Sequence, residues 1–247
     1  MGAKAMGVGY ASACLQDEWA LHNNIAGLAK IDQPIAAFSY DARPSFPGFN
    51  RMAALFAMPV GPGVAGVGIY RFGDNLYSEQ ILSTGFANQF GLASLGIKVN
   101  CIQYQAQGFG TAQAFTVNFG GIATLTPRLS VGAHIVNINQ PKLSELTGET
   151  IPTRMMAGLG FKPSDNLQIV VEAEKDIGYR LLWKTGMEYK LHKKFLARTG
   201  FNLYPTAGFF GAGFRPKRFS FDYALQYTNT IGIRHQASVS YNFKMKP

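Results

Sequence analysis

Charge is scarce in this sequence, and so are long apolar runs. Of its 247 residues, 15% are charged and 47% are hydrophobic, and the mean hydropathy is +0.01. A protein that crosses a membrane with helices would be far more apolar. One stretch, residues 52–70, is uncharged and long enough to span a bilayer as a helix. Its two prolines and four glycines break helices, so it predicts a hairpin with strands at 52–58 and 64–72 around the turn 60–63.

Cysteine and histidine are also rare, which limits the chemistry that the chain offers. Its two cysteines, Cys14 and Cys101, show no spacing that indicates a disulfide, and we expect two free, buried thiols. The four histidines form no metal-ligand pattern, and no G-x-S-x-G motif is present. We therefore expect no metal, no cofactor and no catalytic residues. A surface enzyme built from distant strands would instead have a serine or aspartate hydrogen-bonded to His134 or His192.

A secretory leader is missing from the sequence as given. Residues 1–10 lack the apolar segment of a signal peptide, so an outer-membrane protein would require that its leader has been removed. The net charge is +9, and the basic residues are scattered, which argues against a nucleic-acid-binding groove. Basic residues near strand ends either contact anionic lipid head groups or lie in solvated turns.

Glycine and aromatic residues, by contrast, are abundant, with 28 glycines, 19 phenylalanines and 11 tyrosines. Segment 233–243 shows the dominant pattern: every second residue from Gln236 is polar, and the residues between are apolar and end in Tyr241 and Phe243. A strand with one apolar and one polar face, and no helix to cover it, is satisfied in a closed sheet with lipid outside. We expect Tyr241 and Phe243 to act in barrel closure and assembly.

Strand-like segments of this kind follow one another from residue 31 onward, with turn residues between them. About fourteen are expected, at 34–41, 50–58, 64–72, 76–86, 91–104, 112–126, 129–139, 152–161, 166–174, 181–191, 194–203, 207–215, 218–227 and 233–243. Short connections favour antiparallel neighbours. The sequence therefore predicts an all-β fold, a transmembrane antiparallel up-and-down β-barrel that comprises residues 31–247.

The first 30 residues differ from the rest, because they are small, glycine-rich and non-alternating, with a short helix expected at 17–29. A barrel of about 14 strands is too wide to be filled by its own side chains. We expect residues 1–30 to plug the lumen as a hatch. The polar strand faces carry four glycines: Gly186, Gly200, Gly211 and Gly213. These glycines either let the hatch lie close to the wall or permit curvature of the barrel.

Charged residues on the polar faces form a second candidate site, a charge network in the lumen. Its members are Glu172, Glu174, Lys184, Glu188, Arg198 and Asp222. With a turn near Gly178, Glu172 lies opposite Lys184 across the strand pair. The next turn likewise places Glu188 opposite Arg198. We expect these pairs to brace the wall and anchor the hatch, and the alternative is a polar conduction path.

Aromatic residues on the apolar faces, such as Trp183 and Tyr189, are expected to contact lipid and form interfacial girdles. A route for hydrophobic compounds would need apolar residues on the inner face. The alternation places only Leu182 and Val170 there, which argues against transport of fatty acids.

The N-terminal segment reads G-A-K-A-M-G-V-G at 2–9 and D-E-W-A-L-H-N-N-I-A-G-L-A at 17–29. It resembles the hatch of the PorV/PorQ-like branch of the FadL-type outer-membrane barrels of Bacteroidota, which usually reads G-A-R-A-x-G-M-G, an acidic pair, then W-N-P-A-G-L-A. Ile25 stands where proline is usual. The C-terminal half is similar in its E-x-E-K, G-x-E-Y, R-x-G and D-Y-A motifs, at 172–175, 186–189, 198–200 and 222–224.

This resemblance covers nearly the whole chain and implies a fourteen-stranded barrel with a hatch in its lumen. The hatch residues would include Gly2, Gly7, Gly9, Asp17, Asn23, Asn24, Ala26 and Gly27. It also implies a multi-pass protein of a Gram-negative outer membrane, in contact with outer-membrane lipid and lipopolysaccharide. We expect a plugged, non-enzymatic subunit of a type IX protein secretion or surface-assembly complex, which binds other subunits of that complex. The alternative is a transporter of hydrophobic small molecules.

Overall fold

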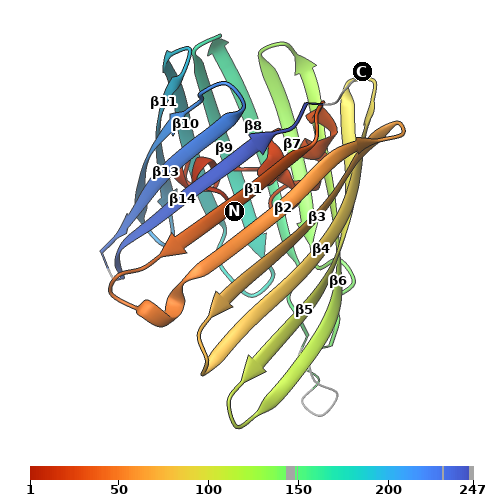
Figure 1. Cartoon of the computed structure of the whole chain (residues 1–247), viewed down its shortest axis with the longest axis vertical. Helices are drawn as coiled ribbons and strands as arrows, with labels where there is room; N and C mark the ends of the chain where they lie inside the picture. Colours follow the sequence, from red (N-terminus) through yellow and green to blue (C-terminus); the bar gives the residue numbers. More distant parts are fainter. Residues whose placement is uncertain (143–147, 149, 230, 245–247) are drawn as a thin grey trace.

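The chain forms a closed barrel of fourteen antiparallel strands, in which each strand pairs with its neighbours in sequence and β1 pairs with β14 (Figure 1). The computed structural model describes residues 1–142, 148, 150–229 and 231–244. The strands are β1 (Ile35–Ala42), β2 (Arg51–Val60), β3 (Gly63–Gly73), β4 (Tyr77–Phe90), β5 (Ala93–Ala106), β6 (Gly110–Thr126), β7 (Leu129–Val136), β8 (Arg154–Ser164), β9 (Leu167–Asp176), β10 (Leu182–His192), β11 (Phe195–Leu203), β12 (Ala207–Phe214), β13 (Phe219–Thr228) and β14 (Gly232–Asn242). The predicted fold class and number of strands are confirmed.

Alternation of side chains between the two faces of each strand explains the closure. In β14, Gln236 and Ser240 are buried on the inner face, whereas Ala237 and Ile233 are exposed on the outer face. The same two-residue period places Phe219, Phe221 and Tyr223 of β13 outside. A sheet that is apolar on its outside and closed on itself leaves no backbone group unpaired in lipid. The pattern read from the last segment therefore describes the wall correctly.

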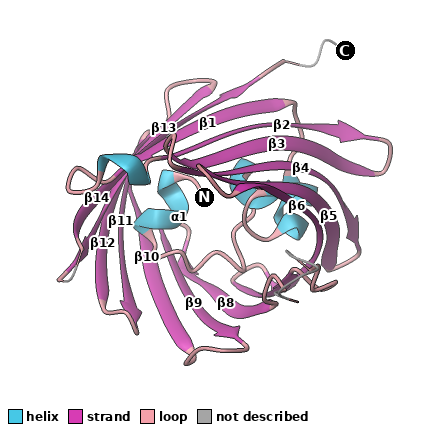
Figure 2. Ribbon diagram, turned by 90° about the horizontal axis from the view of Figure 1, so that it is seen from below, coloured by secondary structure: helices cyan, strands magenta, loops and turns pink. Residues whose placement is uncertain are grey.

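Three short helices precede the first strand, and Figure 2 places helices within the ring of strands. They are α1 (Ala3–Gly7) and the 3₁₀ helices η1 (Glu18–Leu21) and η2 (Ile25–Lys30). The single helix expected at 17–29 is wrong in detail, because two caps divide it. Asp17 accepts a hydrogen bond from the Trp19 N–H at 3.0 Å, and Asn24 accepts one from the Ala26 N–H at 3.2 Å.

Connections differ in length between the two rims of the barrel. One rim holds the start of β1 and the end of β14, and five of its turns have two residues: 61–62, 91–92, 127–128, 165–166 and 193–194. We call it the short-turn rim. The other, the long-loop rim, carries the longer connections 43–50, which includes η3 (Pro47–Phe49), 137–153 and 177–181.

Strand ends differ from the expected ones by a few residues. The predicted hairpin around 60–63 is confirmed, with Val60 paired to Gly63. Strand β7 ends at Val136 rather than at 139, because Asn137 has a φ of 59°, which strands do not accommodate. Within the described part of the chain, no helix is long and apolar enough to cross a membrane.

Candidate functional site: the N-terminal segment against the inner wall

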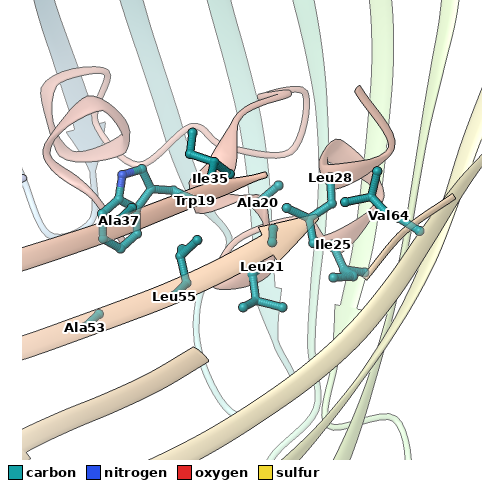
Figure 3. Packing of buried hydrophobic residues seen from close by; sticks show 12 residues of the cluster. Trp19, Ala20, Leu21, Ile25, Leu28, Ile35, Ala37, Ala53, Leu55 and Val64 are labelled. Carbon is teal, nitrogen blue, oxygen red and sulfur yellow. The ribbon is translucent and has the colours of Figure 1, made fainter. Parts of the chain in front are cut away.

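Residues 1–30, here called the N-terminal segment, pack their apolar side chains against the inner faces of β1 to β4. Trp19, Leu21 and Leu28 are at most 2% exposed and belong to one cluster with Leu55 and Val64 of the wall (Figure 3). A second cluster joins Ala3 and Met6 of α1 to Phe209 of β12. The segment is thus fixed to two separate parts of the wall by burial of apolar surface.

Glycines of the inner wall let the segment approach the strands closely. A Cβ atom on Gly186 would lie 2.3 Å from the Val8 carbonyl oxygen, and one on Gly200 would lie 2.3 Å from the Gly9 nitrogen. A Cβ on Gly211 would lie 3.1 Å from the Gly7 Cα. Of the four predicted glycines only Gly213 differs, because it faces the side chains of Arg198 and Asp222. Close approach of the segment therefore explains three of the four.

Further glycines of the same kind were missed by the sequence analysis. A Cβ on Gly132 would lie 2.0 Å from the Ala13 carbonyl oxygen, and one on Gly120 would lie 2.1 Å from Oδ1 of Asn24. The Asn24 amide donates to the carbonyl oxygens of Ala13 at 2.7 Å and Gly121 at 3.2 Å. Asn24 thus connects two parts of the segment to β6, and glycine leaves the room for it.

Glu172 of β9 is a polar anchor for the segment. Its Oε2 accepts hydrogen bonds from the backbone N–H groups of Ser12 at 2.8 Å and Ala13 at 2.7 Å. Its Oε1 lies 2.7 Å from Nζ of Lys184, which also lies 2.5 Å from Oε2 of Glu174. The register pairs Lys184 with Glu172, as the turn near Gly178 predicts. One carboxylate therefore joins the wall to the segment.

Arg198 of β11 is the centre of a second set of charges. Its Nε lies 2.5 Å from Oε2 of Glu188, and its Nη1 lies 2.6 Å from Oδ1 of Asp222. The Arg198 side chain is fully buried. Arg215 also reaches Asp222, at 2.8 Å. The predicted pairing of Glu188 with Arg198 is present in the register, and all six predicted network residues take part in ion pairs.

A further ion pair, between Asp41 of β1 and Arg234 of β14, was not predicted. Nε of Arg234 donates to Oδ1 of Asp41 at 2.6 Å, and Nη2 donates to Oδ2. The Arg234 guanidinium lies 5.9 Å from the centre of the Tyr10 ring. The sequence could have predicted that Arg234 faces the lumen, because it lies two residues before Gln236 and therefore on the same face of the strand.

The predicted hatch residues are distributed over the N-terminal segment and are mostly buried. Gly2, Gly7, Asn24, Ala26 and Gly27 are buried. Gly2 and Gly9 have positive φ values of 87° and 67°, a conformation that favours glycine. Asn23 donates to the Met1 carbonyl oxygen at 3.0 Å. The predicted residues therefore share one folded segment.

Lys4 and Asp17 form an ion pair of 3.2 Å inside this segment. Burial alone would lower the pKa of Lys4, but the carboxylates of Asp17 and Glu188 outweigh it and hold that pKa above its usual range. Lys4 thus stays charged and links the segment electrostatically to Glu188 of β10. Burial also raises the pKa of the Cys14 thiol to about 11.

The thiols and histidines partly depart from expectation. Both cysteines are free, but only Cys14 is buried, since Cys101 lies on the outer face of β5 and is half-buried. His134 is buried, and its Nδ1 has no hydrogen-bond partner among the described residues. His192 accepts a hydrogen bond from the Lys194 N–H at 3.4 Å.

The inner face is more apolar than the sequence analysis expected. The alternation of the sequence predicted Leu182 and Val170 as the few inward apolar residues, and Val170 does contact the N-terminal segment. A separate cluster, which we call the inner apolar patch, consists of Ile102, Ala114 and Ile151 with Ile81 and Tyr104 packed against it. The prediction of scarcity is wrong, because strands β2 to β6 carry apolar residues on both faces and give no contrast that marks the inner one.

Solved structures with a similar fold include a transporter and a channel for hydrocarbons. The Pseudomonas putida toluene transporter TodX has a TM-score of 0.79 and 12% identity, with 100% of this chain and 99% of that chain covered. The CymD monoaromatic hydrocarbon channel has a TM-score of 0.77 and 13% identity, with 99% and 98% covered. A Pseudomonas aeruginosa FadL homologue has a TM-score of 0.71 and 14% identity, with 99% and 98% covered.

No protein-family model and no curated protein sequence matches the chain. The structural likeness extends over the whole barrel and includes the N-terminal segment, because nearly all of each chain is covered. The protein therefore has the fold of the FadL-type barrels, a multi-pass architecture of the Gram-negative outer membrane.

Proposed function

We propose that this barrel is a passive channel for small apolar molecules, closed by its N-terminal segment. The observation that carries this proposal is the inner apolar patch around Ile102 and Ala114. Water-filled barrels have polar interiors, and an apolar lining instead favours molecules that water solvates poorly. The structural likeness to a toluene transporter and a monoaromatic hydrocarbon channel supports the same assignment.

The patch lies toward the long-loop rim, where Ile102 and Ala114 face each other on β5 and β6. Ile151, from the connection between β7 and β8, covers them and is 8% exposed. An apolar molecule that enters from this rim would therefore meet apolar side chains before it reaches the N-terminal segment.

A polar cavity of about 290 Å³ lies on the other side of the segment. It is lined by Lys4 and Gln16 of the segment and by Arg128 and Lys162 near the short-turn rim. This space between segment and wall is a candidate exit, and small displacements of residues 1–30 would connect it to the inner apolar patch.

The proposal is tested by uptake in Gram-negative cells that lack a channel of this kind, because the saccharide layer of their outer leaflet resists apolar solutes. Expression should raise the initial rate of radiolabelled toluene uptake. Ile102→Asn, which introduces a polar amide into the patch, should reduce that rate several-fold, whereas Thr111→Asn at the exposed end of β6 should not. Uptake equal to that of cells without the barrel would refute the channel.

A second candidate function, a subunit of a type IX secretion complex, rests on the sequence resemblance to the PorV/PorQ-like branch. Purification in mild detergent from the native organism, followed by mass spectrometry, separates the two. A stoichiometric protein partner, together with unchanged toluene uptake in expressing cells, would favour the secretion subunit.

A further inference from the structure

The outer wall of β3 to β6 changes from apolar to polar at one row of paired residues, which we call the boundary level. At this level four outward residues lie side by side on adjacent strands: Arg71, Gln80, Gln103 and Gln113. The next outward level toward the short-turn rim consists of Ile69, Leu82, Cys101 and Phe115. Ile69, Leu82 and Phe115 are each more than half exposed. On these four neighbouring strands the apolar surface thus ends at the same register row.

This boundary lies near the long-loop rim, since Arg71 precedes the end of β3 by two residues. Outer-membrane barrels have short turns on the periplasmic side and longer loops outside. Arg71 therefore lies near the end of the barrel that faces the outer leaflet, where lipid phosphates lie. Figure 1 shows β2 to β6 as neighbouring, long strands on this side of the barrel.

A groove of about 500 Å³ lies in the wall directly at the boundary. Its outward lining combines apolar residues, among them Phe38, Met52 and Leu82, with Arg71 and Gln80. Ala54 is the cause of the depression, because it is a small residue between Phe38 and Ile69 at the same level. The volume lies within the range of about 300–1,000 Å³ that is typical of small-molecule sites.

Arg71 is exposed, and no described residue forms an ion pair or hydrogen bond with its guanidinium. Guanidinium groups bind phosphate with two parallel hydrogen bonds, and the neighbouring amides of Gln80 and Gln103 can donate to the same anion. We propose that this groove is a binding site for one anionic, phosphate-bearing membrane lipid, with its phosphate on Arg71 and an acyl chain along Ala54 and Leu82.

A second outward groove supplies an internal comparison. It has about 470 Å³ and is lined by aromatic residues such as Tyr40, Phe214 and Tyr223, with Ala237 at its floor. None of the described residues that line it is an arginine or a lysine. Lipid chains can enter both grooves, but only the groove at Arg71 combines an apolar floor with a cation at the boundary level. Selectivity for anionic, phosphate-bearing lipids is therefore expected at the first groove alone.

The test is native mass spectrometry of the barrel, released from neutral detergent after incubation with phosphatidylglycerol or phosphatidylcholine of equal chain length. The wild-type barrel should retain one phosphatidylglycerol in preference to phosphatidylcholine by about tenfold, because the choline ammonium group repels Arg71 and phosphatidylglycerol carries no such cation. Arg71→Gln should remove the preference, and Ala54→Phe should remove retention. Inorganic phosphate at millimolar concentration should not displace the lipid.

Two matched variants complete the design. Lys193→Gln removes a positive charge at the short-turn rim, and Ala237→Phe fills the comparison groove. Both variants should retain the two lipids as the wild type does. Unheated gel mobility verifies that each barrel is folded. Equal retention of the two lipids, a preference unaffected by Arg71→Gln, or displacement by inorganic phosphate would overturn the proposal. Toluene uptake is independent of this result, so the two proposals can fail separately.

Discussion

Glu172 and Lys184 lie opposite each other on β9 and β10, with 2.7 Å between Oε1 and Nζ, and the second carboxylate oxygen holds the backbone of Ser12 and Ala13. Glu172 is 1% exposed. A buried carboxylate in this position neutralises a lysine of the wall and at the same time satisfies two donors of the N-terminal segment. The same residue thus stabilises the barrel and the position of the segment.

Replacing Glu172 by glutamine should loosen the segment. The amide keeps one acceptor but presents an NH₂ group to the backbone, so the variant loses charge-assisted bonds of about 2 kcal/mol in free energy of unfolding. Trypsin should then cleave after Lys4 faster than in the wild type, as followed by mass spectrometry. Glu79→Gln, at the long-loop end of β4, makes the same chemical change without contact to the segment and should leave cleavage unchanged. Equal cleavage in both variants would contradict the anchoring role.

Replacing Glu188 by glutamine distinguishes bracing from conduction. Arg198 would keep Asp222 but lose its 2.5 Å partner, and a buried cation with incomplete pairing destabilises the fold by about 2–3 kcal/mol. We expect a lower midpoint of urea unfolding and an unchanged single-channel conductance in planar bilayers. An altered conductance with wild-type stability would instead support a polar conduction path.

Gly186→Ala should displace the N-terminal segment, because the new Cβ would lie 2.3 Å from the Val8 carbonyl oxygen. Neither atom can move away by a change of side-chain rotamer, so the backbone must shift. Overpacking of this kind costs about 1–3 kcal/mol, so cleavage after Lys4 should rise about tenfold. Gly208→Ala on β12 is the matched control, since nothing lies within 4 Å of its Cβ position. If both alanines leave cleavage at the wild-type rate, close packing of the segment is refuted.

The two tryptophans report on the two sides of the wall. Trp183 is 47% exposed on the outer face of β10, whereas Trp19 is 2% exposed inside the barrel. In bilayers of brominated phospholipid, the fluorescence of Trp19→Phe, which keeps Trp183, should be strongly quenched. The fluorescence of Trp183→Phe should be nearly unaffected. The reverse result would mean that the apolar rows do not face lipid.

His22 should make the barrel less stable in acid. Its pKa is lowered to about 3, first by burial and then by the charge of Lys98, while the unfolded chain titrates near 6.5. Above pH 6.5 both states are neutral. Below it only the unfolded state binds the proton, so the free energy of unfolding falls between pH 6.5 and 3, by up to about 1.4 kcal/mol per pH unit.

His22→Gln should therefore reduce the loss of stability between pH 7.5 and pH 5, measured from urea unfolding at both values. His192→Gln, at the exposed end of β10, should keep the wild-type difference. An identical pH dependence in wild type and His22→Gln would show that another group is responsible.

Much of the barrel was predictable because strands have a strict two-residue period. The alternation in β9 to β14 predicted which side chains face the lumen, and short turns fixed the register that pairs Glu188 with Arg198. The local sequence was sufficient to predict the register of these strands, because each turn joins two strands that are neighbours in the sequence. For β2 and β5 the prediction of which side chains face the lumen was poorer. Leu55 and Ile102 are apolar residues on the inner face, and nothing in the local sequence distinguishes them from residues that face outward.

By itself, the sequence determined the strands, their order and the composition of the two faces, because these depend on residue spacing within about ten positions. Only the tertiary structure decided which residues that are distant in the sequence contact each other. Asp41 reaches Arg234 only when the first strand closes on the last, and Gly186 meets Val8 only when the N-terminal segment lies inside the ring. Such contacts join residues more than 170 positions apart, and closure of the sheet, rather than any local pattern, brings them together.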